Sequence, residues 1–154
     1  MPHRPSLAVL CLLVACGGRA GPSTTSAPAT SAEGAVRSFM QAVADSDLAK
    51  MANYWGSAKG PAGKTGDPPD YEKRMLIMQA YLLKAGYRIV SDSSVGSGDT
   101  RDVQVELRRE GCTRLVPFTV IRSADGSWIV NQVDLAAAGS PVRPCPSAPA
   151  DSAR

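Results

Sequence analysis

Apolar positions follow a helical period in the first half of the chain. They recur three and four residues apart, which places them on one side of a helix. Three helices are predicted: the first capped by Ser31, the second capped by Asp45 or Ser46 and stopped by Gly56, the third beginning near Asp70. Their apolar stripes are Val36, Phe39, Met40 and Val43; Leu48, Met51, Ala52 and Trp55; and Tyr71, Met75, Met78 and Leu82, with Leu76 and Leu83 widening the last before Gly86 ends it.

The second half of the chain shows the two-residue alternation of β-strands. Strands are predicted at residues 87–90, 103–108, 113–121 and 128–135, with residues 91–100 as a loop. Helices followed by an antiparallel meander are typical of an α+β fold, here N-terminal helices packed on an antiparallel sheet.

The turns between the predicted strands set their expected register. A two-residue turn at residues 110–111 places Leu107 opposite Arg114, and a turn centred on Ala124 places Arg114 opposite Asp134. One face of the sheet then collects apolar side chains that should pack on the helices. These are Val103, Val105, Leu107, Val116, Phe118, Val120, Trp128 and Val130.

The opposite sheet face is also apolar, which predicts a covering partner. We expect a second copy of the chain, forming a homodimer, or a different protein there; the alternative is that the C-terminal tail or strand twist covers it. The residues concerned are Leu115, Ile121, Ile129, Val133 and Leu135.

Polar residues gather at one end of the predicted inner face. Arg114, Gln132 and Asp134 converge there, and with Trp128 they form a candidate ligand-binding set. A few polar groups at the end of an apolar concavity are typical of a small-ligand pocket. The alternative is a cross-strand ion pair of Arg114 and Asp134, which would have little energetic weight.

Two stretches resemble the nuclear transport factor 2-like superfamily: AVRSFMQAVADSDLAKMANYW near the start and DGSWIVNQVDL near the end. The resemblance implies a curved sheet that wraps the helices into a cone. It also implies an alternative function, a ketosteroid isomerase-like enzyme with Asp134 as base in an apolar cavity and Tyr54 or Tyr87 as donor. The first helix, where the resemblance places the tyrosine donor, contains no tyrosine.

The N-terminus, MPHRPSLAVLCLLVACGG, has the features of an export signal. His3 and Arg4 precede an apolar run at residues 7–15, which is too short to cross a hydrocarbon core of ~30 Å. The run ends in Leu-Val-Ala-Cys, which resembles the lipobox of bacterial lipoproteins. The resemblance implies that Cys16 carries acyl chains such as palmitate and becomes the first residue; an ordinary secretory signal is the alternative. By the same resemblance, Gly17 in place of an aspartate implies the periplasmic side of the outer membrane, if the cell has an outer membrane.

The predicted organisation has four parts. Residues 1–15 are the signal peptide, and residues 16–31 are the lipidated cysteine and a flexible tether rich in small and hydroxylated residues. Residues 32–136 form the α+β domain, and residues 137–154 are a Pro/Ala/Ser-rich tail.

The cysteines and the single histidine restrict the chemistry. Cys112 and Cys145 would form a disulfide in an oxidising compartment. The bond would close a loop of about 34 residues and stabilise the folded state by ~3–4 kcal/mol. His3 is the only histidine, which excludes Ser-His-Asp catalysis and histidine-ligated metals from the mature chain. We therefore expect no cofactor or metal, and a non-catalytic envelope lipoprotein that binds a protein partner or a small ligand.

The net charge and one glycine-rich stretch show whether the chain is expected to bind nucleic acids or nucleotides. The formal net charge is +3 with acids and bases interspersed, so nucleic-acid binding is not predicted. The stretch GPAGKTG, residues 60–66, ends like a phosphate-binding loop, but Ala58 stands where that motif needs its first glycine. It also follows a helix instead of a strand, so a mobile loop is predicted.

The predicted disulfide can be checked by mass. We expect the intact mature protein to be lighter by two hydrogen atoms than the reduced protein, because one Cys112–Cys145 bond replaces two thiols. Mass spectrometry before and after reduction measures this, and two free thiols in the exported protein would contradict the pairing.

Overall fold

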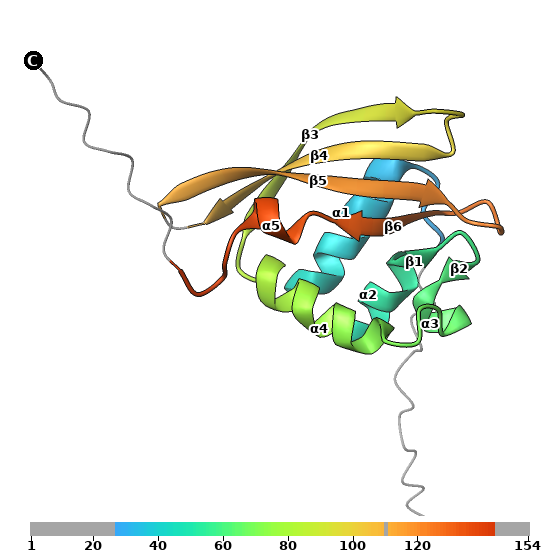
Figure 1. Cartoon of the computed structure of the whole chain (residues 1–154), viewed down its shortest axis with the longest axis horizontal. Coiled ribbons are helices and arrows are strands. Elements are labelled where there is room, and N and C mark those ends of the chain that lie inside the picture. Colours follow the sequence, from blue (N-terminus) through green and yellow to red (C-terminus); the bar gives the residue numbers. More distant parts are fainter. Residues whose placement is uncertain (1–26, 110, 144–154) are drawn as a thin grey trace, which may run out of the picture.

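The computed structural model describes residues 27–109 and 111–143 and has an α+β architecture, as predicted. Cys16, Cys145 and the predicted signal peptide lie outside the described residues. Figure 1 shows α1 lying across one face of a four-stranded antiparallel sheet. The elements in order are α1 (Ala32–Ala44), α2 (Leu48–Tyr54), β1 (Gly56–Ser57), β2 (Gly60–Pro61), α3 (Ala62–Thr65), α4 (Tyr71–Leu82), β3 (Gly86–Val95), β4 (Thr100–Arg109), β5 (Cys112–Arg122), β6 (Trp128–Val133) and α5 (Leu135–Ala138).

Helix α1 forms as its sequence predicts. The Ser31 hydroxyl accepts a hydrogen bond from the Gly34 backbone N–H at 3.0 Å and caps the helix. The whole predicted stripe is buried against the sheet: Val36, Phe39, Met40 and Val43. No helix in the described part of the chain is long and apolar enough to span a membrane.

The capping residue of α2 differs from the prediction, whereas α4 begins where predicted. Asp47, not Asp45 or Ser46, caps α2, since its carboxylate accepts from the Lys50 N–H at 2.9 Å. Ser46 instead has a left-handed φ of 57°, which turns the chain out of α1. Helix α4 begins after Asp70 as predicted and ends at Leu82, before Gly86.

One side of α4 packs and the other does not. Met75, Met78 and Leu82 are buried in the core, as the stripe predicts. Leu76, however, is 53% exposed, so it does not widen the buried face. Ile77 is exposed as well, at 42%. Helix α4 therefore carries two large apolar side chains on its accessible surface.

Strand β3 is longer than predicted, because the stretch expected to be a loop supplies its second half. Residues 91–95 pair with β4, and the turn is confined to residues 96–99. Arg101 adds side-chain contacts to this pairing: its guanidinium donates to the Asp92 carboxylate and to the Ser94 hydroxyl, both at 2.6 Å. A strand at the sheet edge can carry such polar residues because water reaches it.

The predicted register is confirmed between β4 and β5 and is wrong between β5 and β6. Leu107 does lie opposite Arg114 across β4 and β5. Between β5 and β6, Val120 lies opposite Val130 instead of Trp128, because the turn is centred one residue later than expected. Asn131 is then an extra residue in β6, a β-bulge, and its side-chain amide donates to the Gly56 carbonyl at 2.8 Å.

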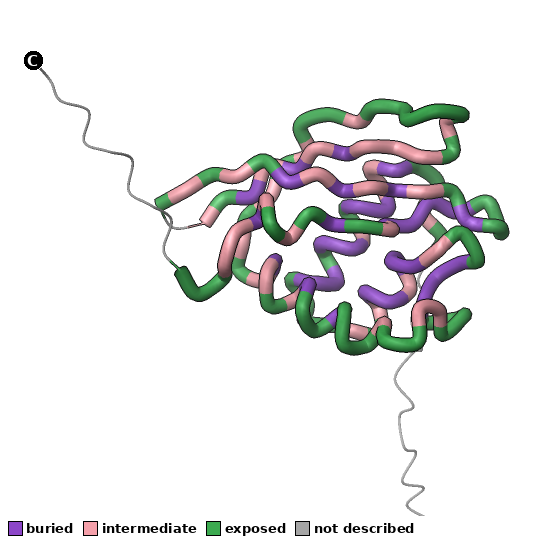
Figure 2. The backbone as a smooth tube through the Cα atoms, viewed as in Figure 1, coloured by how far each residue is buried: buried purple, intermediate pink, exposed green. Residues whose placement is uncertain are grey.

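The inner sheet face is buried as a set, which Figure 2 shows along β4, β5 and β6. The bulge also changes the outer face, because it turns Val133 inward to the core. Ile129 is buried, and Leu135 starts α5 instead of ending a strand. Leu115 remains as the large exposed apolar residue of the predicted outer set, at 54%. The outer face is thus less apolar than the sequence predicts.

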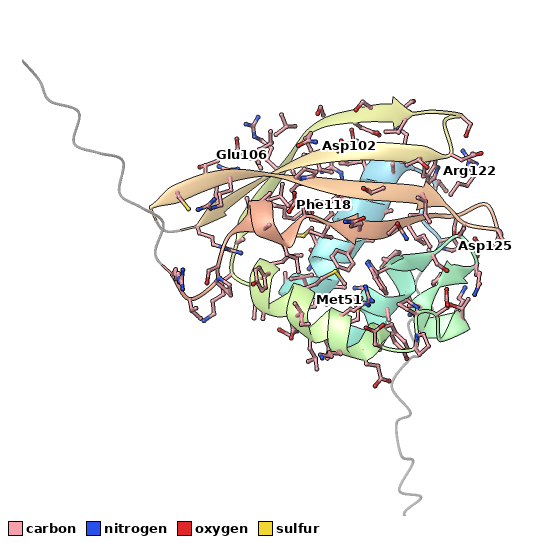
Figure 3. All side chains as sticks on the ribbon, viewed as in Figure 1. Met51, Asp102, Glu106, Phe118, Arg122 and Asp125 are labelled. Carbon is pink, nitrogen blue, oxygen red and sulfur yellow. The ribbon has the colours of Figure 1, made fainter. Side chains whose placement is uncertain are left out.

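Truncating the core centre should be costly. Phe118 is fully buried between the sheet and the helices (Figure 3), so we expect Phe118→Ala to lower the free energy of unfolding by about 3–5 kcal/mol. Leu115→Ala on the same strand should change it by no more than about 0.5 kcal/mol. Urea titrations measure both, and equal losses in the two variants would contradict this account of the core.

Candidate functional site

Of the four candidate ligand-binding residues predicted from the sequence, only Gln132 and Asp134 come together, since both line a pocket beside the end of β6. Asp134 is exposed, and its carboxylate caps α5 by accepting from the Ala137 N–H at 2.9 Å. Arg114 lies against Gly139, where a side-chain carbon would come within 2.8 Å of its guanidinium. The structure gives no ion pair between Arg114 and Asp134, because the actual register of β6 separates them. The predicted pairing of these two residues is wrong.

Trp128 is separated from this end of the sheet. It opens β6, and the guanidinium of Arg122 stacks 4.8 Å from the centre of its ring. Gln132 is exposed at the opposite end of β6, next to Asp134. An isomerase would need Asp134 in an apolar cavity. An exposed helix cap does not provide that environment, so no observation favours the enzyme alternative.

The glycine-rich stretch is ordered structure and not the predicted mobile loop. Gly60 and Pro61 pair with β1, and α3 then makes one helical turn that ends at Gly66 with a left-handed φ of 66°. The Asp67 carboxylate accepts from the Ser57 hydroxyl at 2.7 Å, which lowers the pKa of Asp67, with Lys59 adding to the effect. These contacts close the β1–β2 segment beside the sheet.

Asp125 makes a compact cluster at the tip of the β5–β6 hairpin, seen in Figure 3. Its carboxylate lies 2.6 Å from the Ser127 hydroxyl and 2.7 Å from the Ser123 hydroxyl, and accepts from the Ser127 N–H at 3.0 Å. The hydrogen bonds from Ser127, then Ser123, lower the pKa of Asp125 to about 2. So weak a base cannot activate a serine at neutral pH, and the cluster serves to fix the turn.

Cys112 is disulfide-bonded. Because Cys145 lies outside the described residues, the pairing of these two cysteines stays a prediction. Nearby, Arg109 donates to the carbonyls of Ala138 and Gly139 at 3.1 and 3.4 Å. Those bonds hold the C-terminal end of α5 against the sheet. In the described part of the chain, no three His, Cys, Asp or Glu side chains are grouped to hold a metal.

A further candidate site is a groove between α4 and β6, which we call the α4–β6 groove. It has a volume of about 380 Å³, within the range of small-molecule sites. Apolar side chains form much of its lining, and charged side chains of the first turns of α4 supply the rest. The lining residues are Trp55, Asp70, Lys73, Arg74, Ile77, Met78, Asn131, Gln132, Val133 and Leu135.

Trp55 is fixed in this groove by its backbone. It leaves α2 in an extended conformation, its carbonyl accepts from the Ala62 N–H at 2.8 Å, and it bridges Val130 of β6. The residue is only 5% exposed, and its indole Nε1 is buried with no hydrogen-bond partner in the described structure. An unsatisfied buried donor costs ~1–3 kcal/mol, so this nitrogen is an unused binding group.

The charged side of the groove carries a net positive charge. Arg74 donates to Asp70 at 3.0 Å, and this hydrogen bond lowers the pKa of Asp70, with a smaller effect of Lys73. Lys73 has no ion pair in the part of the chain that the structure describes. Two cations against one anion leave one positive charge at this side of the groove.

Sequence reasoning missed this groove. The helical period assigns Trp55 to the core, and the residue is indeed buried. The period does not predict whether its indole N–H finds a hydrogen-bond partner. The only local signal was a tryptophan at a helix end followed by glycine, at Gly56. Of the four candidate residues, only Gln132 lines the groove.

The chain matches no protein-family model, and neither curated proteins nor solved structures show significant similarity to it. The groove must therefore be interpreted from its own chemistry.

The Asp125 cluster gives a pH-dependent prediction. A carboxylate whose pKa falls from 3.8 to about 2 on folding stabilises the protein fully above pH 3.8, and this stabilisation is lost as the pH falls through about 2. We expect Asp125→Asn to cost about 1 kcal/mol at neutral pH, after allowance for solvent exposure.

The measurement is urea unfolding of Asp125→Asn and wild type between neutral and acid pH. The difference should shrink as the pH falls from 3.8 towards 2. Glu72→Gln, on the exposed surface of α4, is the control and should show little difference. A constant gap for Asp125→Asn at every pH would contradict a role for the charge.

Proposed function

We propose that the chain is a lipid-anchored envelope protein whose single α+β domain binds a small ligand or a protein partner without catalysis. The observation that carries the anchor is the Leu-Val-Ala-Cys motif ending at Cys16, directly after the apolar run of residues 7–15. Several acyl chains on one cysteine make a stable anchor, whereas a single chain binds only marginally. Gly17 favours the periplasmic side of the outer membrane.

The order of elements supports a nuclear transport factor 2-like domain as part of the proposal. Helices come first, the strands β3 to β6 follow in sequential antiparallel order, and α1 crosses the sheet (Figure 1). In such a domain the space between helices and sheet is available for side chains or for a ligand. Here Phe39, Met51 and Phe118 are fully buried within it.

Binding without catalysis is supported by how the carboxylates are used. Asp125 fixes a turn with a pKa of about 2, and Asp134 caps α5. The sequence has no histidine after His3. The α4–β6 groove, in contrast, joins an apolar lining to a positive charge, and one of its lining residues, Trp55, has a buried indole N–H without a partner in the described structure.

Metabolic labelling tests the anchor. In cells fed an alkyne-palmitate, we expect the wild-type protein to incorporate label and to partition with membranes. Cys16→Ala should lose both properties because the acyl acceptor is removed. Cys11→Ala is the matched control, since it removes a cysteine from the same apolar run, and it should keep the label. Equal labelling of the Cys16→Ala protein would overturn the lipoprotein proposal.

A further inference from the structure

We propose that the α4–β6 groove binds a small monocarboxylate with an apolar body. The proposal rests on the binding role proposed above and names the site and the chemical class of ligand. One carboxylate oxygen would lie on the Lys73 side of the groove, and the other would accept from the Trp55 indole N–H. The apolar body would cover Ile77 and Val133.

The lining of the groove selects an apolar body. Trp55 and Met78 are buried residues that reach the groove, and Val133 and Leu135 continue its apolar lining. Ile77 is 42% exposed beside them, which is costly for a large apolar side chain in water. A ligand that covers Ile77 would remove this apolar surface from water at ~25 cal/mol per Å².

The indole N–H of Trp55 selects a hydrogen-bond acceptor. The Nε1 atom is screened from water by the surrounding side chains. A ligand therefore reaches it only when a neighbouring side chain moves. Ile77 and Gln132 line the same groove as Trp55 and are exposed. A ligand oxygen that enters would accept a hydrogen bond from the Trp55 indole N–H, which has no partner among the described residues.

The charges select a monoanion. Lys73 and Arg74 face one carboxylate, Asp70, which Arg74 already binds at 3.0 Å. The remaining positive charge matches one carboxylate group, and a cationic ligand would be repelled. The neighbouring groove between α2 and α4 lacks these features: its lining includes Glu72 and no lysine or arginine.

The two tryptophans of the chain allow a direct test. With ¹⁵N-labelled tryptophan, the indole N–H signals of Trp55 and Trp128 can be followed separately by NMR, and Trp55→Phe assigns them. The sample is the complete mature chain from residue 16 with Cys16→Ser, exported so that its disulfide forms. The probes are 4-phenylbutanoate and its uncharged analogue 4-phenylbutan-1-ol.

We expect 4-phenylbutanoate to shift the Trp55 signal and to leave the Trp128 signal unchanged. Lys73→Ala should weaken this binding about two- to fivefold, the range for an exposed charge contact, and should not affect the alcohol. Lys84→Ala removes the same charge from a residue that does not line the groove and should have no effect. Ile77→Phe narrows the groove at an exposed position and should abolish the shift.

Three outcomes would overturn the proposal. No shift of the Trp55 signal with either probe would remove the site. Equal affinity for acid and alcohol would remove the carboxylate specificity. A shift of the Trp128 signal alone would place binding elsewhere. None of these results bears on acylation of Cys16, and loss of acylation would leave the groove intact. The experiments therefore test the lipid anchor and the groove independently.

Discussion

The rest of the structure depends on the burial of α1 against the inner face of the sheet. Val36 and Phe39 on the helix and Val116 and Phe118 on β5 are all fully buried. Each such side chain contributes ~1.5–3 kcal/mol when it leaves water, so this contact outweighs any single ion pair on the surface. The described ion pairs are mostly exposed, as in Arg37–Glu33 and Arg74–Asp70. Charge therefore does not decide the fold, and the surface charges are available for recognition.

The sequence predicted the parts of the fold that depend on local period. The stripe of α1 and the alternation of β4 and β5 both place apolar residues correctly, because these periods repeat over several turns or residues. The second half of β3 was missed, since residues 91–95 are mostly polar and become a strand by pairing with β4, a pairing to which the Arg101 side chain adds contacts. Such a contact joins two strands and cannot be read from either one alone.

The candidate site was predicted less well, because it depended on the register of one hairpin. A turn centred one residue later moves every pair between β5 and β6, and the bulge at Asn131 then changes which face Val133 occupies. The predicted meeting of Arg114 and Asp134 rested on that register. Trp55 was correctly assigned to the core, yet the groove that it lines also needs residues of α4 and β6, which only the folded chain brings near.

The groove has one rigid side and one adaptable side. On its rigid side, Trp55 at the C-terminal end of α2 is held by backbone contacts to Ala62 and to Val130 of β6. Its adaptable side is the outer surface of α4, where Lys73 and Ile77 are exposed. A fixed tryptophan sets the position of an apolar ligand without loss of its own freedom, which reduces the entropic cost of binding. Exposed side chains opposite it can close over the ligand, so affinity here should follow how well Ile77 and Lys73 fit the ligand more than any change in the sheet.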